Sequence, residues 1–322
     1  MKILKKIALI GLLFFPLIGS ANQKTMIRLG VLAYGTVNWE LNTLKQQGLL
    51  ETEQYKLKII PMASPQAGKV ALLSGSVDMI VADWVWVSRQ RSVGNDYSFY
   101  PYSNTTGALV VKNDSPVKQL SDLKKKKLAV AGGELDKNYL LLAAVMQKQG
   151  LTDVLNSLQK VYGAPPLLAH QLQQGRADAL LTYWHYAARL ESEGYRVLLT
   201  GSDLLQQLAV RQQVPSIGYV FNATWANQHK ASVLAFLDKS KQMKNSLCSD
   251  DKTWQGIQTL THAKTTQEDA LLRQRYCAGR IDSWGKAEWL AAETIYQALK
   301  KASDNRLTGT VKTIFPGTFW GN

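Results

Sequence analysis

An aspartate and a tryptophan stand together where a buried strand is expected to give way to a helix, in the stretch D-W-V-W-V-S-R-Q-R from Asp83 to Arg91. One hundred residues later, Tyr183 and Trp184 occupy the same kind of position. Aromatic rings at such a place can stack on a flat or apolar solute. An aspartate there can accept hydrogen bonds from a ligand, although capping the helix explains it as well. These residue types indicate binding chemistry.

Residues for catalysis are scarce. The chain has four histidines, of which His185 alone stands at the end of a predicted strand. It contains no G-x-S-x-G elbow, no phosphate-binding G-x-x-x-x-G-K motif and no H-E-x-x-H motif. Glu40, Asp83, Glu134 and Asp136 could hold a hard cation through oxygen ligands, but their spacing matches no compact metal loop. We therefore predict a protein that is not an enzyme, with no catalytic residue, no cofactor and no metal site.

Short strands and helices alternate along the chain, which is typical of an α/β fold. The first pass of the pattern has strands over 27–33, 55–61, 77–82 and 97–102, and helices over 38–47, 65–73 and 84–92. The second pass has strands over 127–131, 160–162, 177–181 and 195–200, and helices over 136–149, 165–174 and 184–191. We expect two lobes, each with a mixed sheet flanked by helices.

The two passes overlay at an offset of one hundred residues. Chance can match glycines and aspartates at turns, because most α/β lobes use them there. Matching tryptophans and arginines as well favours duplication or a strong architectural similarity. The matched pairs include Asn38 and Asn138, Pro65 and Pro165, Asp78 and Asp178, Trp84 and Trp184, and Arg89 and Arg189.

Two extended segments are expected to join the lobes. The apolar stretch over 107–111 leaves the first lobe and the stretch over 216–221 returns to it, which makes a two-strand hinge. The predicted lobe 1 comprises residues 22–106 and 218–322, and lobe 2 comprises residues 107–217. The remaining helices, which we expect to pack as a tail on lobe 1, are predicted over 228–246, 251–261, 267–276 and 286–302.

Residues 1–21 have the pattern of a secretory signal peptide. Three lysines precede an apolar run over 7–18, and Gly19-Ser20-Ala21 resembles a cleavage site. An uncleaved anchor is the alternative, although the run is shorter than the roughly 20 residues of a membrane span. We expect a soluble protein exported to the periplasm. Oxidising conditions there permit a disulfide between Cys248 and Cys277, with two free thiols as the alternative.

The formal net charge is +14 at pH 7. Such a charge favours anionic partners, namely a membrane surface, an acidic protein or an anionic solute. No basic stripe is interleaved with aromatic residues, so we expect no nucleic-acid binding. We expect a monomer.

Ligands bind beyond the carboxyl ends of the strands in open parallel sheets, where helix N-termini present free N–H groups. Two lobes that face each other would direct both sets of strand ends into one cleft. Each candidate also has a structural explanation: Asp83 and Asp136 as helix caps, Trp39 and Trp84 as core aromatics. The predicted ligand-binding residues are Asn38, Trp39, Ser64, Gln66, Asp83, Trp84, Ser103, Gly133, Asp136, Tyr183, Trp184 and Tyr219.

The chain resembles the type II periplasmic solute-binding proteins of ABC transporters, in the nitrate, sulfonate, taurine and thiamine-precursor class (SsuA/THI5-like, NMT1-like). The resemblance covers nearly the whole mature chain and lies most clearly in I-R-L-G-V-L-A-Y-G-T, A-L-L-S-G-S-V-D-M-I-V-A-D and D-L-K-K-K-K-L-A-V-A-G-G. Lys125 stands where the class usually has glycine. The segments D-W-V-W-V-S-R-Q-R, A-G-G-E-L-D-K, Y-G-A-P-P-L-L and P-G-T-F-W resemble a narrower branch found near PQQ-dependent alcohol oxidation and lanthanide-related uptake.

The resemblance implies capture of a small solute between the lobes and its delivery to an ABC permease in the inner membrane. Three alternatives stay open: an enzyme similar to the thiamine-pyrimidine synthases, a sensor receptor, and a receptor for a metal complex. The signal peptide and the few histidines oppose the enzyme. The charge of the solute also stays open. The basic chain favours an anion, whereas Asp83, Glu134 and Asp136 favour a cationic or donor-rich group.

Overall fold

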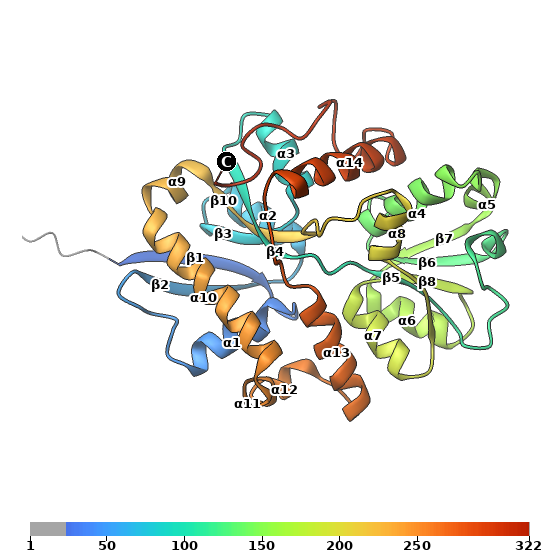
Figure 1. The fold of residues 1–322 in the computed structure, drawn as a ribbon, viewed down its shortest axis with the longest axis horizontal. Coiled ribbons are helices and arrows are strands. Elements are labelled where there is room, and N and C mark those ends of the chain that lie inside the picture. The colour runs from blue at the N-terminus through green and yellow to red at the C-terminus, as the bar shows by residue number, and fades with distance from the viewer. Residues whose placement is uncertain (1–23, 322) are drawn as a thin grey trace, which may run out of the picture.

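The computed structural model describes residues 24–321, which form two α/β lobes side by side (Figure 1). The expected signal peptide, residues 1–21, lies outside the described residues. Each lobe contains one five-stranded mixed sheet with helices on its faces, as the alternation of strands and helices predicted.

The sheet of lobe 1 has the strand order β2-β1-β3-β10-β4. Strand β1 runs parallel to β2 and β3, whereas β10 runs antiparallel to β3 and β4. The strands are β1 (Thr25–Leu32), β2 (Tyr55–Met62), β3 (Met79–Ala82), β4 (Tyr97–Ser103) and β10 (Ile217–Asn222). The helices between them are α1 (Val37–Gln46), α2 (Pro65–Leu73) and α3 (Trp84–Ser92).

The sheet of lobe 2 repeats this plan with the order β7-β6-β8-β5-β9. Strand β5 is antiparallel to both its neighbours, as β10 is in lobe 1. The strands are β5 (Ala108–Val111), β6 (Lys127–Ala131), β7 (Gln159–Gly163), β8 (Ala179–Thr182) and β9 (Arg196–Thr200). The helical segments are the 3₁₀ turn η1 (Leu120–Leu123), α4 (Lys137–Lys148), α5 (Thr152–Ser157), α6 (Pro165–Gln173), α7 (Trp184–Ser192) and α8 (Gly201–Gln207).

The chain crosses between the lobes at two adjacent segments. Ser216 binds the first crossing twice, because its N–H donates to the Ser103 carbonyl at 2.8 Å and its hydroxyl donates to the Thr105 carbonyl at 2.6 Å. Gly279 lies beside them and accepts a hydrogen bond from the N–H of Asn104 at 3.1 Å. A Cβ at Gly279 would lie 2.2 Å from Thr105 Cγ2, so glycine is required there. The hinge therefore contains two crossings and one supporting segment.

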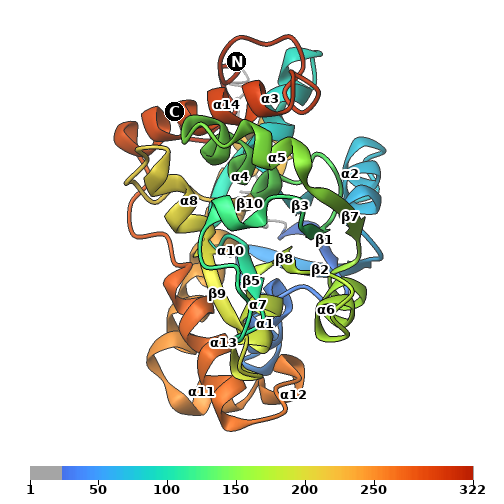
Figure 2. The ribbon, with the colours of Figure 1, turned by 90° about the vertical axis from the view of Figure 1, so that its right-hand side faces the viewer.

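The helical tail contacts both lobes, whereas we expected it to pack on lobe 1. Helix α10 packs on α1 and β2 of lobe 1 as predicted, but α13 packs against α7 and α14 against α4, both in lobe 2. Helix α14 and the group α11–α13 lie at opposite ends of the molecule in two perpendicular views (Figures 1 and 2). The tail comprises α9 (Ala223–Gln228), α10 (Lys230–Ser249), α11 (Asp251–Gln255), α12 (Gln258–Thr261), α13 (Thr266–Ala278) and α14 (Lys286–Ala302).

The last described residues return to lobe 1. The N–H of Phe99 on β4 donates to the Thr318 carbonyl at 2.8 Å, and the N–H of Trp320 donates to the Phe99 carbonyl at 2.9 Å. Phe319 is buried between them. The C-terminal segment thus continues the sheet beyond β4.

Cys248 on α10 and Cys277 on α13 form a disulfide. The bond fixes α10 and α13 to each other. Lys125 adopts φ +61°, a left-handed conformation that glycine takes up more readily than lysine, which agrees with the expectation of glycine in this turn. Among residues 24–321, no helix combines the length and the apolarity that crossing a membrane requires.

Candidate functional site

A cavity of about 350 Å³ lies between the two lobes. Its walls come from the ends of β1 and β3 and the starts of α2 and α3 in lobe 1, and from the starts of α4 and α7 in lobe 2. The crossing residues 105–107 and 214–217 line it as well, and α14 covers it with Ile295 and Leu299. The cavity therefore lies where the carboxyl ends of the strands of both lobes meet, as two facing α/β lobes require.

Asp83 joins the lobes across this cavity. One carboxylate oxygen accepts the N–H of Trp86 at 2.9 Å and so caps α3. The other lies 3.2 Å from the ammonium of Lys137 in lobe 2 and 3.8 Å from that of Lys69 in lobe 1. Burial raises the pKa of Asp83, but the two lysines and the N–H of Trp86 together outweigh burial and hold the pKa below its usual value. The cavity wall thus contains a carboxylate shared by two ammonium groups.

Lys137 is charged in this environment. Burial lowers the pKa of its ammonium, and the carboxylates of Asp83 and Asp136 together raise it above the usual value. Lys69 has less support, because burial lowers its pKa more than Asp83 raises it. The side chain of Lys137 keeps 34% of its exposure and that of Lys69 27%, so both retain surface toward which a ligand could place an acceptor.

Asp136 caps the neighbouring helix α4. Its carboxylate accepts the N–H of Asn138 at 2.9 Å. Burial raises the pKa of this carboxyl group, and Lys137 and the helix N–H groups offset the rise only in part. Gly132, with φ +95°, passes close by, and a Cβ there would lie 3.2 Å from both the Asp136 carboxylate and the Tyr183 hydroxyl. A larger residue at position 132 would crowd this part of the wall.

His185 contributes a neutral imidazole to the wall. Burial, and secondarily the charge of Arg189, lowers its pKa to about 4. Its Nδ1 atom is buried and has no hydrogen-bond partner among the described residues. A buried polar atom without a partner is costly to the folded state.

Two tryptophans supply aromatic surface. Trp84 is fixed by a hydrogen bond of 2.9 Å from its Nε1 to the Pro215 carbonyl, beside the second crossing. Trp184 meets the edge of Trp39 at 6.0 Å between ring centroids, and this contact links lobe 2 to lobe 1. Both tryptophans line the cavity. The two positions with which the sequence argument began therefore lie in the wall of one cavity, one from each lobe, although Trp84 is 3% exposed and packs mainly on Tyr296 and Phe319.

Five of the twelve predicted binding residues line the cavity, namely Asp83, Trp84, Asp136, Tyr183 and Trp184. Their contact with a ligand stays a prediction. The other seven lie elsewhere and are Asn38, Trp39, Ser64, Gln66, Ser103, Gly133 and Tyr219.

Local structure accounts for most of these seven. The amide of Asn38 donates to three carbonyls of the preceding turn, and Ser64 caps α2 at 3.1 Å. Trp39 is buried among the aromatic residues of α7, α11 and α13, and Tyr219 binds Ser240 inside lobe 1. The hydroxyl of Ser103 donates to the Gly279 carbonyl at the hinge.

The other two face solvent. Gln66 is exposed on the first turn of α2, and a Cβ at Gly133 would meet open space. The neighbouring Gly132, which was not selected, is the glycine that faces Asp136 and Tyr183.

Sequence reasoning missed both lysines of the wall. Lys137 follows Asp136 directly, and Lys69 lies one turn after Pro65 on α2. Their closeness in the sequence to Asp136 and Gln66, which are both predicted binding residues, could have pointed to them. Lysines at helix starts usually extend into solvent, however, so only the fold shows that these two are enclosed.

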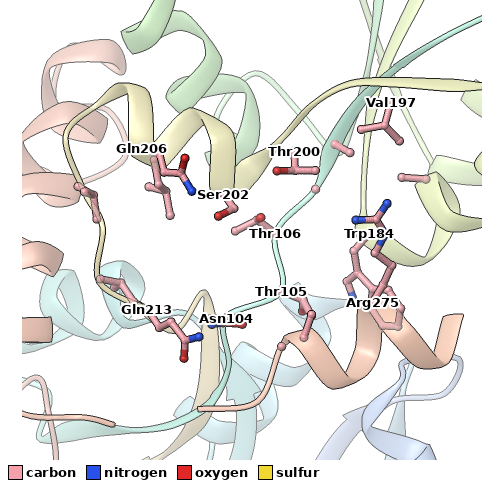
Figure 3. A pocket seen from close by; sticks show the side chains of 18 of the residues that line it. Asn104, Thr105, Thr106, Trp184, Val197, Thr200, Ser202, Gln206, Gln213 and Arg275 are labelled. Carbon is pink, nitrogen blue, oxygen red and sulfur yellow. The ribbon is translucent and has the colours of Figure 1, made fainter. Parts of the chain in front are cut away.

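A second cavity, of about 260 Å³, is lined by residues 104–108 and 210–214 of the two crossings (Figure 3). Trp184 and residues 105–107 line both cavities, so they form the partition between them. Figure 3 shows Arg275 of α13 beside Trp184, and this arginine binds Glu191 of α7 at 2.8 Å. A ligand in either cavity could therefore contact Trp184.

A match to a family model identifies the family of the chain. Residues 41–245, more than half of the chain, match the model of a family described as NMT1/THI5 like. The chain belongs to the NMT1/THI5-like family.

Among curated relatives of this NMT1/THI5-like protein is a putative aliphatic sulfonates-binding protein of Escherichia coli (strain K12). It is 28% identical over 242 residues, which cover 71% of this chain and 73% of the relative. Among solved structures, the periplasmic aliphatic sulphonate binding protein SsuA from Escherichia coli superposes with a TM-score of 0.73. That match has 22% identity and covers 92% of each chain.

The alkanesulfonate-binding protein SsuA from Xanthomonas axonopodis pv. citri, solved bound to MOPS, gives a TM-score of 0.68. It is 17% identical over 92% of this chain and 98% of its own. These similarities confirm the two-lobed periplasmic-binding-protein fold. The relatives are described as binding proteins, and the curated relative supports a solute-binding role for this NMT1/THI5-like chain.

Proposed function

We propose that this protein is the periplasmic solute-binding component of an ABC importer. It captures one small solute in the cavity between the lobes, and the closed complex delivers the solute to a permease in the inner membrane. The pattern of residues 1–21 supports export, and relatives described as periplasmic support the compartment.

The observation that carries the proposal is the composition of the cavity wall. Asp83 and Trp84 come from lobe 1 and Lys137 and Trp184 from lobe 2, and all four line the same cavity. A solute that contacts both lobes stabilises the closed arrangement by the contacts that it gains there. The cavity can therefore couple the presence of the solute to the shape that a permease recognises.

Binding can be tested by thermal unfolding and by tryptophan fluorescence. The panel contains sulfonates, pyrimidines and lanthanide chelates, because the sequence left these classes open. A ligand of the folded state raises the unfolding temperature by mass action. Trp84 and Trp184 should report the same ligand through a change in emission.

A matched pair of variants locates the site. Tyr183→Ala removes a ring from the cavity wall, and Tyr162→Ala removes one from β7 in the same lobe, outside the cavity. We expect Tyr183→Ala to weaken binding at least about tenfold and Tyr162→Ala to leave it unchanged. Equal effects of the two substitutions, or no response to any solute class, would contradict the proposal.

The metal-dependent alternative lacks a candidate site in the part of the chain that the structure describes. Within residues 24–321, no group of three or more His, Cys, Asp or Glu side chains is arranged to hold a metal ion. A metal complex differs from a bare ion, because its ligands contact the protein, and the chelates in the panel test it.

A further inference from the structure

The charges of the cavity wall balance. Among the described residues, four charged side chains line the cavity: Lys69, Asp83, Asp136 and Lys137. Two are cationic and two are anionic, and His185 beside them is neutral. The sum is zero, although the whole chain carries +14.

The wall charges are also paired locally. Asp83 binds Lys137 at 3.2 Å and lies 3.8 Å from Lys69. The other oxygen of Asp83 accepts a hydrogen bond from the N–H of Trp86, and the carboxylate of Asp136 accepts one from the N–H of Asn138. The helix ends of α3 and α4, which could otherwise attract an anion, are thus already capped by the carboxylates of the protein.

Charges around the cavity are paired as well. Arg189, which acts on His185, forms an ion pair with Glu268 of α13. Glu134, which the sequence suggested as a source of negative charge in the cleft, binds Arg306 outside the cavity. Arg189 and Glu134 are therefore each neutralised by a partner of their own.

The rest of the lining is largely apolar. Trp84, Leu141, Trp184, Ile295 and Leu299 form much of it. Transfer of an ion from water into such an enclosure is costly unless the ion finds a partner. A solute with one unbalanced charge would bring that charge into a wall whose own charges already neutralise each other.

We propose that Lys69, Asp83 and Lys137, together with Asp136, select a solute of zero net charge, either neutral or zwitterionic, over singly charged solutes. The inference depends on the proposed function, because it concerns the ligand of the same cavity. It separates this chain from a receptor for simple sulfonates, which carry one negative charge. The anionic end of a zwitterion can bind the lysines and its cationic end can bind Asp136, while the net charge of the occupied cavity stays zero.

The first experiment compares solutes of matched shape and different charge. Benzamide, benzenesulfonate and benzamidine form one set, and 3-aminopropanesulfonate and propanesulfonate form another. They are measured by calorimetry within a library of solutes that contains all three charge classes. We expect the tightest ligands to carry zero net charge and to bind at least about tenfold more tightly than their charged counterparts.

The outcomes separate the two proposals. Tighter binding of singly charged anions, which the starts of α1 and α7 could attract because neither has a side-chain cap, overturns the charge selection and leaves solute binding intact. If no solute of any charge class binds, the result counts against the proposed function and therefore also against the charge selection.

The second experiment changes the charge of the wall. Asp83→Asn leaves the wall at +1 and should shift preference toward anions, while asparagine still caps α3. Lys137→Gln leaves it at −1 and should shift preference toward cations. The double variant returns to zero and should regain the preference of the wild type. Each shift is expected as a change of at least about tenfold in the ratio of affinities within one matched set.

Glu134→Gln is the control, because it removes an exposed charge of lobe 2 that does not line the cavity. Its ratio of affinities should equal that of the wild type. Circular dichroism and the unfolding temperature establish that each variant is folded. If folded Asp83→Asn and Lys137→Gln keep the wild-type ratio, these residues do not select charge.

Discussion

Lys244 shows how strongly one residue can depend on its partners. It is 5% exposed in the core of lobe 1, where its ammonium lies 4.1 Å from the ring centroid of Tyr102 and donates to the carbonyl of that residue at 3.2 Å. Burial lowers its pKa to about 8 against the attraction of Glu40. Burial likewise raises the pKa of Glu40, and the charge of Lys244 opposes this rise. Tyr102 donates a hydrogen bond to the Glu40 carboxylate.

Removal of Lys244 should expose this dependence. We expect Lys244→Met to lower the free energy of unfolding by about 3–5 kcal/mol, because Glu40 would stay buried without its cation. Glu40→Gln combined with Lys244→Met should recover most of the loss. Urea denaturation measures both. The control is Lys241→Met on the same helix, at an exposed position, which should have little effect. Equal losses in the single and double variants would show that the pair is not coupled.

His185 should make stability depend on pH. Burial lowers its pKa from 6.5 to about 4, so between these values the unfolded chain binds a proton that the folded chain does not. The free energy of unfolding must then fall as the pH drops from 6.5 to 4, by roughly 3 kcal/mol for this group. His185→Phe should remove that part of the decrease. Denaturation curves at pH 7 and pH 4.5 test it, and an identical decrease in both proteins would refute it.

At the scale of elements, the disulfide stabilises the tail. It closes a loop of 29 residues between α10 and α13. We expect Cys248→Ala with Cys277→Ala to lower the free energy of unfolding by about 3–4 kcal/mol, the value that the chain-entropy estimate assigns to a loop of this length. Denaturation of the wild type under reducing conditions should give a similar loss. If neither treatment changes the free energy of unfolding, the disulfide does not stabilise the protein and the prediction is wrong.

The regular elements were predictable because their patterns are strong. Both passes of strands and helices lie where the alternation and the turn glycines placed them. Short elements were missed, since α5 and α8 have six and seven residues and carry little periodicity. The helix predicted over 251–261 is divided into α11 and α12, because Ile257 departs from helical dihedral angles with φ −113° and ψ 4°. The carbonyl of the preceding Gly256 accepts the amide of Gln46.

The site was predictable only in part. Position after a strand identified Asp83 and Trp84, since parallel strands end at one edge of a sheet. The same rule selected Trp39, yet the tail covers this residue with Trp254 and Tyr276. No local pattern shows where a distant tail will pack. For the same reason the enclosure of Lys137 could not be inferred from its neighbours.

At the scale of the molecule, the tail restrains the lobes. Helix α13 holds α7 through the ion pairs of Arg189 with Glu268 and Arg275 with Glu191. Helix α14 holds α4 from the other end through a shared apolar cluster. Opening the cleft must therefore break one of these contacts or move the tail with lobe 2.

Spin labels at Lys56 on lobe 1 and Gln147 on lobe 2, both exposed, can measure this restraint. We expect Arg189→Ala with Arg275→Ala to broaden the distance distribution toward longer values in the ligand-free protein. The control is Arg306→Ala, because its ion pair with Glu134 is half exposed and contributes little. A distribution unchanged by the double substitution would show that α13 is no restraint.

The pairing of residues 318–320 with β4 bears on how lobe 1 folds during synthesis. Phe99 is joined to Thr318 and Trp320 by backbone hydrogen bonds, so lobe 1 combines β1 with a sheet edge that residues 318–320 supply. Synthesis runs from the N-terminus, so this edge can form only after residues 318–320 have left the ribosome, long after β1 and β4 have done so.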